Sequence, residues 1–412
     1  MKLLNAVLFA LTLPSGLQAD ELRILTSFPS GMTAAFKELW DEHFPRTEIR
    51  FLNKNTISAV EEVQRGNLRG FDLFWASSPE AFVLLDRSDH FAPMGACGAD
   101  GPASVEGFAI SSVGWARRTE SELFMPAEWN DLLLPIYRDQ IAMARPARSG
   151  TTHLLVEQIL QMRGWDAGWS YLLQLSSNLS TLTARSHGVP SGLLKDRFDI
   201  GLMIDFLALS QGEALQFRYG RPTMIFAAQI GILNGGGNGP AACDFVRLLL
   251  SRDGQMTLTD PRISRTPIDP DVRHEVAARI PQNITTGLQL AWLDYDAETS
   301  ADRFWAVNTL FDLMITDVLN DRRSLWRRYS DLQGQTSDEA MSHVRRLLST
   351  VPVSETQAIR ISRGAEPGLR PEVQPLAGSF ERDIVGLWRR EVAVQLRDAD
   401  AILTQLEQDA AR

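Results

Sequence analysis

The chain has 412 residues and a formal net charge of −10, because 51 acidic residues outnumber 41 basic ones. This balance argues against nucleic acid as the main partner. The length is enough for two or three domains, each with a sizeable apolar core. The six histidines and two cysteines show no metal-ligand spacing, so we expect no metal site and no cofactor.

Residues 1–19 have the pattern of a cleaved secretory signal peptide. One charge, at Lys2, precedes the apolar stretch Leu3–Leu13, and the small Ala19 marks the expected cleavage site. The stretch is too short to span a bilayer, so we expect a mature chain in the periplasm without membrane insertion. An uncleaved anchor is the alternative.

The exported chain contains two cysteines, Cys97 and Cys243. An oxidising compartment permits a disulfide between them. Their spacing leaves open both a disulfide and a pair of free buried thiols.

Strand-like and helix-like segments alternate at the start of the mature chain. Apolar runs predict strands over 22–26, 48–52 and 71–75. Helical spacing predicts one helix after Ser30, a candidate N-cap, and another over 57–63. Strands that alternate with helices imply right-handed crossovers and a parallel sheet.

The middle of the chain repeats this alternation. The turn Arg148–Thr152 follows an apolar strand and opens a helix, and Asp205 ends another apolar strand. A glycine-rich segment at 235–239 punctuates the chain after the last strand-like run. In chain order, we expect strands over 140–144, 179–183, 200–204, 217–219 and 224–233, and helices over 151–163, 166–176 and 241–250.

The pattern changes near residue 286, where strand signals end and charged helices dominate. A helical stripe of apolar residues runs from Phe304 to Leu319, and we expect it to pack against the neighbouring lobe. A docking face for a membrane partner is the alternative. A Gly- and Pro-rich linker, 364–378, precedes a final helix that reaches about Gln408.

Five segments between residues 20 and 275 form a recurring pattern. They are Leu25-Thr26-Ser27-Phe28, Phe71-Asp72-Leu73-Phe74, Ala144–Thr152, Asp199-Ile200-Gly201-Leu202, and Phe245–Gln255 with Arg265-Thr266-Pro267 behind it. In order and spacing, these segments resemble the type II periplasmic solute-binding proteins of ABC transporters. The most similar group holds the ferric-ion, thiamine, phosphonate and phosphosugar binders.

This resemblance implies an α/β fold of two lobes that close about hinge strands near 110–116 and 230–235. The implied parts are the signal peptide 1–19, lobe one (20–112 and 232–285), lobe two (113–231) and a C-terminal α-helical extension (286–412). Within the extension, Tyr295–Glu298, Leu310–Asp312 and Ile315–Asp317 resemble the phosphoglycerate transport regulatory proteins. Those proteins are periplasmic binding-protein homologues thought to pass solute signals to a membrane sensor kinase.

The resemblance implies a monomeric binding protein for a small anionic organic solute, with phosphorylated solutes ranked first. It would serve ABC-type uptake through a membrane permease, or transport regulation. The alternative is a sensory adaptor that signals a phosphoglycerate-like solute to the ectodomain of a histidine kinase. The ferric binders of the group use adjacent tyrosines, and no two tyrosines are adjacent in this sequence, so iron binding is not carried over.

A secreted hydrolase is a reading of another class. It would need a nucleophile with an adjacent base. His153 follows Ser149 by four residues within a helix, where its imidazole is poorly placed to take the hydroxyl proton. We therefore expect no enzymatic activity.

The first candidate site consists of Arg148, Ser149, Gly150, Thr151 and Thr152. The first N–H groups of a helix and the positive end of its dipole attract anions. Three hydroxyls and the cation of Arg148 add further donors. The alternative is an ordinary helix N-cap made by Ser149 or Thr151.

A comparable strand–turn–helix at the start of the mature chain would face this site from lobe one. We expect Ser27, Ser30 and Gly31 there, with Ser77 and Ser78 adding hydroxyls from the end of the third strand. Ligands bind such sheets at the carboxyl ends of parallel strands. Turn formation and capping alone are the alternative.

The loop Arg185-Ser186-His187 and the carboxylate of Asp205 complete the candidate set. Arg185 and His187 can donate to phosphate or carboxylate oxygens. Asp205 can accept hydrogen bonds from hydroxyls of a sugar-like or glycerate ligand. A solvated histidine and a helix N-cap at Asp205 are the alternatives.

Overall fold

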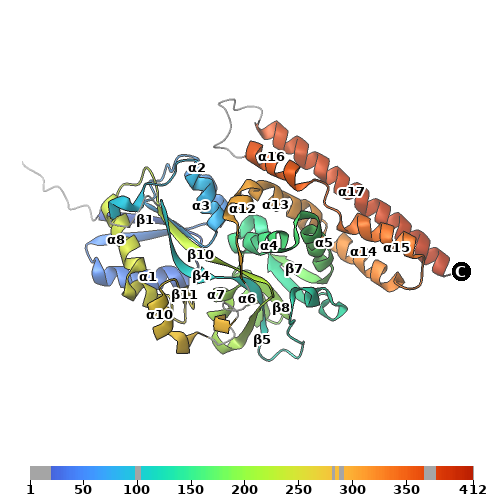
Figure 1. Ribbon diagram of the computed structural model, residues 1–412, viewed down its shortest axis with the longest axis horizontal. Helices are drawn as coiled ribbons and strands as arrows, with labels where there is room; N and C mark the ends of the chain where they lie inside the picture. The colour runs from blue at the N-terminus through green and yellow to red at the C-terminus, as the bar shows by residue number, and fades with distance from the viewer. Residues whose placement is uncertain (1–19, 98–103, 281–283, 287–291, 366–376, 412) are drawn as a thin grey trace, which may run out of the picture.

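The computed structural model describes residues 20–97, 104–280, 284–286, 292–365 and 377–411. Its strands form two sheets, each with helices packed beside it (Figure 1). The predicted signal peptide, residues 1–19, lies outside these described residues. None of the helices described has a stretch long and apolar enough to cross a membrane.

The first sheet contains both parallel and antiparallel strands. In sheet order, the strands are β11 (Thr266–Pro267), β4 (Val105–Ser111), β10 (Thr223–Ile232), β3 (Leu73–Ala76), β1 (Asp20–Thr26) and β2 (Thr47–Asn53). The short strand β12 (Trp292–Asp294) pairs with β10 beside this path. The predicted parallel pairing is confirmed for β1, β2 and β3, whereas β10 runs antiparallel to β3 and β4.

We call this sheet, with the helices that precede and follow its strands, the first body. Its helices are α1 (Ser30–His43), α2 (Thr56–Gln64), α3 (Pro79–Asp86), α8 (Gly239–Leu250), α9 (Arg252–Thr257) and α10 (Pro270–Glu275). Ser30 begins α1, but the N-cap is Pro29, which makes no side-chain cap. The predicted Ser30 N-cap is therefore wrong.

Aromatic side chains fill the core of the first body. Phe36 lies on the buried face of α1, which shows the helical spacing that the sequence predicts. Trp75 of β3 contacts Phe36 and Phe28 edge-on, with ring centroids 5.2 and 4.9 Å apart. Edge-on aromatic pairs of this kind add to the free energy gained by burying the rings. A disulfide between Cys97 and Cys243 joins the segment before β4 to α8, which decides between the two states that the sequence left open.

The second sheet forms a separate body with its own helices. In sheet order, the strands are β7 (Leu179–Thr183), β6 (Ile141–Ala144), β8 (Ile200–Ile204), β5 (Val113–Arg118) and β9 (Leu215–Tyr219). Its helices are α4 (Gly150–Arg163), α5 (Trp165–Leu175), α6 (Gly188–Leu194) and α7 (Asp205–Leu209). β6 runs parallel to β7 and β8, while β5 runs antiparallel to β8 and β9. We call this sheet with its helices the second body.

The chain first crosses between the two bodies at Ser112, which separates β4 from β5. The Ser112 hydroxyl donates to the Met224 carbonyl oxygen at 2.6 Å, and its N–H donates to Asp205 at 2.8 Å. Ser112 is thus hydrogen-bonded to residues of both bodies at the point of crossing.

The second crossing lies at residues 220–222, between β9 and β10. Thr223–Ile225 of β10 pair with β12, and from Phe226 onward the strand pairs with β4 and then also with β3, so β10 belongs to the first sheet. The predicted hinge near 230–235 and the lobe boundary at residue 231 are therefore wrong. The glycine-rich segment that follows β10 suggested a hinge, whereas the crossing occurs at the turn before it.

The C-terminal extension is mostly helical, but it also contributes β12, so the expectation that strands end at residue 286 is wrong. Its helices are α12 (Ala297–Asp302), α13 (Phe304–Phe311), α14 (Leu319–Leu332), α15 (Asp338–Ser349), α16 (Glu355–Ala365) and α17 (Ala377–Ala410), with a π-helical segment over Asp312–Thr316. Figure 1 shows α14 and α15 at the end of the molecule farthest from α1, and the long α17 runs from beside α16 to that end. The predicted packing of the apolar stripe is confirmed, since Val307, Leu310 and Phe311 share one core with the second body.

Candidate functional site

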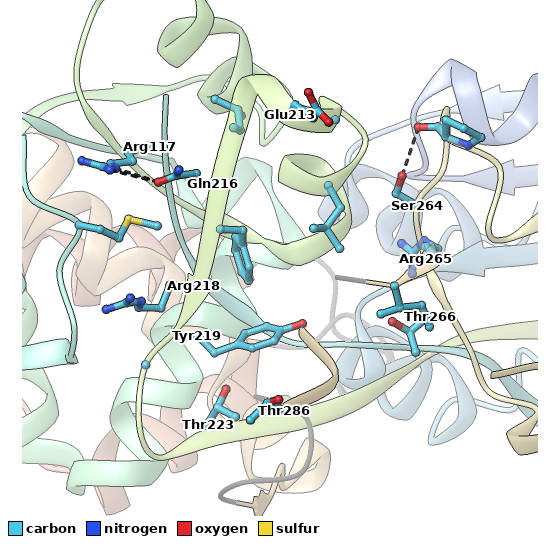
Figure 2. Close-up of a pocket in the computed structure, with 18 of the residues that line it drawn as sticks. Arg117, Glu213, Gln216, Arg218, Tyr219, Thr223, Ser264, Arg265, Thr266 and Thr286 are labelled. Atoms are coloured by element: carbon cyan, nitrogen blue, oxygen red, sulfur yellow. Dashed lines mark hydrogen bonds between the residues drawn. The ribbon is translucent and has the colours of Figure 1, made fainter. Parts of the chain in front are cut away.

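A cavity of about 1270 Å³ lies between the second body and a segment of the first. One wall is β9, with the side chains of Phe217 and Tyr219, and the other is the segment from Thr259 to Thr266. Figure 2 shows the Tyr219 ring extending from β9 toward Ser264, Arg265 and Thr266. A cavity between two α/β bodies is a common place for a small ligand.

Arg265 is the most unusual residue of this cavity. Its side chain is buried, with 2% of its surface exposed, and Nη2 donates to the Ser77 hydroxyl at 2.5 Å. Its Nε and Nη1 atoms have no hydrogen-bond partner among the described residues. A buried donor without a partner is costly, so an acceptor brought by a ligand would be strongly favoured here.

The guanidinium of Arg265 lies between aromatic rings from both bodies. Its Cζ atom is 3.8 Å from the ring centroid of Phe206 in α7 and 4.5 Å from that of Phe28, which follows β1. Burial lowers the pKa of Arg265 to about 9, although nearby Asp205 opposes this shift. The group is therefore still a cation at neutral pH, and no carboxylate of the described residues forms a salt bridge with it.

The turn before Arg265 has an uncommon backbone. Ser264 has a φ of 51°, in the left-handed region that residues other than glycine seldom adopt. Its N–H donates to the Asp260 carbonyl oxygen at 2.8 Å, and the Arg265 N–H donates to that of Leu258 at 2.9 Å. Backbone strain of this kind often accompanies functional sites, and here it directly precedes the buried arginine.

Asp205 holds Tyr219 and the first crossing in place. Its carboxylate accepts hydrogen bonds from the Tyr219 hydroxyl at 2.7 Å, the Ser112 N–H at 2.8 Å and the Phe206 N–H at 2.7 Å. Burial raises the pKa of Asp205, while these hydrogen bonds and Arg265 act in the opposite direction. Because three protein donors occupy this carboxylate, it positions the cavity wall more directly than it offers an acceptor to a ligand.

The predicted anion site at the start of α4 meets the first body directly. Ser149 caps α4 by accepting from the Thr152 N–H at 3.2 Å, as in the N-cap alternative. Gly150 lies so close to Ser78 that an added Cβ would be 3.0 Å from the Ser78 hydroxyl oxygen and 2.5 Å from that of Thr56. The end of β3 and the tip of α4 thus face each other, but they touch without leaving a ligand cavity between them.

The remaining predicted residues do not line the cavity. Arg148 is exposed and has no side-chain partner among the described residues, and Thr151 is partly buried. Ser27 is partly buried, Ser30 is exposed, and Gly31 faces the Arg262 carbonyl oxygen. Arg185 and Ser186 are partly buried, and His187 is exposed just before α6; burial and Arg185 lower the pKa of His187. Every predicted site residue is described, and none lines the cavity, although Ser77 and Asp205 contact residues that do.

The sequence predicts no catalytic pair of Ser149 and His153, and the structure shows what His153 contacts instead. Its Nε2 lies 3.1 Å from the Ser300 hydroxyl and its Nδ1 3.3 Å from the Asn308 side-chain oxygen. Burial lowers its pKa to about 4. His153 thus belongs to a buried contact with the extension. The described residues contain no group of three or more His, Cys, Asp or Glu side chains that could hold a metal ion.

Known proteins resemble this chain in sequence. Residues 116–298 match the family model described as bacterial extracellular solute-binding protein. The phosphoglycerate transport regulatory protein PgtC of Salmonella typhimurium is 28% identical over 348 residues, which cover 81% of this chain and 86% of PgtC. PgtC of Salmonella typhi matches equally well. Over these residues the chain is similar to the bacterial extracellular solute-binding proteins.

Solved structures show the fold of this chain. The periplasmic binding protein AfuA from Actinobacillus pleuropneumoniae, with exogenous fructose-6-phosphate bound, superposes with a TM-score of 0.60 at 19% identity, covering 71% of this chain and 98% of AfuA. The apo ferric ion-binding protein A of Pasteurella haemolytica gives 0.57 at 14% identity, covering 71% and 97%. The fold is therefore that of the type II periplasmic binding proteins, as expected.

Sequence reasoning overlooked Arg265 and Tyr219 as candidate site residues. Arg265 entered only as part of the segment Arg265-Thr266-Pro267, and Tyr219 only as an unpaired tyrosine. The local signal for Arg265 was weak, because an arginine between a serine and a threonine reads as an exposed turn. Its burial depends on Phe28 and Phe206, which lie far away in the chain.

Proposed function

We propose that this protein binds a small anionic, phosphorylated organic solute in the cavity beside Arg265 and delivers it to ABC-type transport in the periplasm. The observation that carries the proposal is the buried guanidinium, which has unpartnered N–H groups and forms no salt bridge with a carboxylate of the described residues. A phosphate ester carries a charge of roughly −1.5 to −2 at neutral pH and offers strong acceptor oxygens. Such a ligand would supply the two things that Arg265 lacks, namely an opposite charge and hydrogen-bond acceptors.

Electrostatics favours an anion over a neutral solute at this position. The interaction between opposite charges is stronger in a buried site, because less water screens it. A neutral solute would leave the charge of Arg265 without a counter-ion. The names of the relatives point to the same ligand class, since PgtC is named for phosphoglycerate transport and the AfuA structure holds fructose-6-phosphate.

In this proposal, the two lobes are the first and second bodies, and they close about Ser112 and residues 220–222. Ser77 and Asp205 act through Arg265 and Tyr219, which they hold in place. The start of α4, Arg148–Thr152, is a second candidate anion site, which would need the bodies to separate there. Variants of the two sites distinguish them.

The test is calorimetric titration of the purified protein with 3-phosphoglycerate, phosphoenolpyruvate, fructose 6-phosphate and inorganic phosphate. We expect Arg265→Met to weaken the best of these ligands about 100-fold or more, since a buried charge-assisted contact is lost. Arg262→Gln is the matched control, because this arginine of the same segment is exposed and pairs with Glu38 and Asp260. Unchanged affinity in Arg265→Met, with loss in Arg148→Ala, would move the site to the start of α4.

A second function shares the same binding chemistry. The protein would then be a sensory adaptor that presents its liganded form to the ectodomain of a membrane histidine kinase. The name of the Salmonella relatives, a transport regulatory protein, and the long C-terminal extension favour this reading. A pull-down from membranes with and without 3-phosphoglycerate tests it, since capture of a kinase supports the adaptor and capture of a permease supports transport.

A further inference from the structure

The C-terminal extension is joined to the second body by a large apolar core. Phe311, Met314 and Trp326 of the extension belong to the same cluster of buried residues as the strands and helices of the second body. Two ion pairs add to it: Arg145 binds Asp312 at 2.6 Å, and Arg303 binds Glu157 of α4 at 2.8 Å. A core of this extent makes the extension and the second body one mechanical unit.

The extension also contacts the first body, through α12 and the residues beside it. Arg87, at the end of α3, binds Asp302 at 2.9 Å and Glu298 at 2.5 Å. A small apolar cluster joins Leu84 of α3 to Ala301 and Phe304. Figure 1 shows α12 beside α3 at the boundary with α4.

A buried polar contact lies beneath the contact between α3 and α12. The hydroxyl of Tyr295 donates to Glu80 of α3 at 3.0 Å, and its oxygen lies 2.9 Å from the Ser300 hydroxyl oxygen of α12. Ser300 in turn contacts His153 of α4. One chain of hydrogen bonds therefore runs from the first body, through the extension, to the second body.

We infer that α12 is a latch, carried by the second body, that fastens it to α3 of the first body when the two bodies are together. This rests on the proposed function, because the arrangement with the bodies together is taken as the ligand-binding form. If the bodies separate, the extension follows the second body, with which it shares its core. The contacts of α12 with Arg87, Leu84 and Glu80 then break.

The latch contacts are suited to repeated release. They comprise a few ion pairs, a small apolar cluster and one buried hydrogen bond. Glu298, which takes part in one of the ion pairs, is largely exposed. Exposed ion pairs contribute little each, and a small cluster contributes far less than a core. The latch therefore biases the protein toward the closed form without locking it.

The test measures the distance between the bodies in ligand-free protein. Spin labels on Glu42→Cys in α1 and Lys195→Cys, just after α6, report that distance by double electron–electron resonance; both positions are exposed. Arg87→Glu places a negative charge against Glu298 and Asp302, and we expect a second, longer-distance population to appear. Adding Glu298→Arg restores an opposite pair, and we expect this population to shrink again.

Arg328→Glu is the matched control. Arg328 also pairs with two carboxylates, Glu407 and Asp400, but all three residues lie within the extension. We expect its distance distribution to match that of the wild type. Identical distributions for Arg87→Glu and the wild type would overturn the latch, as would an equal change in Arg328→Glu. Because no ligand is added, these outcomes are independent of the Arg265 titrations that test the proposed function.

Discussion

Replacing Glu80 with glutamine should change how the stability of this protein depends on pH. Glu80 is fully buried on α3, where it accepts hydrogen bonds from Ser78 and from the Tyr295 hydroxyl. Burial raises the pKa of Glu80 from 4.5 to about 7, although these hydrogen bonds oppose the shift; the charge of Glu157 raises the pKa further. The folded protein thus favours the neutral acid.

The magnitude follows from the difference between the two pKa values. Because the pKa is higher in the folded state, its stabilising contribution is fully present below pH 4.5 and is lost as the pH rises through about 7. The shift corresponds to about 3 kcal/mol of unfolding free energy. Glutamine has nearly the same shape and does not ionise, so Glu80→Gln lacks this loss.

The assay is urea unfolding followed by tryptophan fluorescence, for wild type and variant, at pH values from 4.5 to 8.5. The difference in unfolding free energy between Glu80→Gln and the wild type should shift by about 3 kcal/mol in favour of the variant across this range. A constant offset from imperfect hydrogen bonding does not affect the shift. Glu122→Gln, at an exposed position, controls for the loss of one charge. A difference that stays the same at every pH would refute the reasoning.

Three further outcomes are expected. Burial lowers the pKa of His153 to about 4. The wild type should therefore lose about 3 kcal/mol of unfolding free energy as the pH falls from 6.5 to 4, and His153→Gln should not. Urea unfolding at acid pH measures this difference. The Cys97–Cys243 disulfide closes a loop with a sequence separation of 146, so replacing both cysteines with serine should destabilise the protein by up to about 5 kcal/mol in the chain-entropy treatment, and a change under 1 kcal/mol would contradict it. Asp205→Asn should weaken 3-phosphoglycerate and phosphoenolpyruvate by similar factors, because Asp205 positions Tyr219; a selective loss for one ligand in calorimetry would show that it contacts the ligand instead.

Local patterns predicted those parts of the fold that depend on local periodicity. The buried face of α1 and the apolar stripe around Leu310 were both visible in the spacing of apolar residues. The insertion of β10 between β3 and β4 was not, because antiparallel pairing of strands distant in the chain leaves no mark on either strand alone. The turn at 220–222 carries the crossing, yet it looks like any other loop in the sequence.

The candidate site was predicted only in part, because its cavity depends on residues that are distant in the chain. The rule that ligands bind at the carboxyl ends of parallel strands placed Ser77 and Ser78 opposite Gly150, and the structure does bring the two tips together. It could not show that the tips touch, or that the cavity lies beside Arg265 instead. Burial of a charged side chain is decided by distant neighbours, so sequence patterns alone read Arg265 as an exposed residue.

If the proposed function holds, the position of Arg265 links the charge of the ligand to closure of the protein. Two aromatic rings lie against its guanidinium. Phe28 belongs to the first body, and Phe206 belongs to the second. Separating the bodies would remove Phe206, admit water and weaken any contact with an anion, because water screens the charge. Bringing them together restores the dry surroundings in which the same contact is strong. An anionic ligand at Arg265 therefore gains affinity from closure, and by linkage it favours closure in turn. A neutral solute would gain nothing comparable, so in the proposed function the same arginine would provide both selectivity for anions and the drive to close.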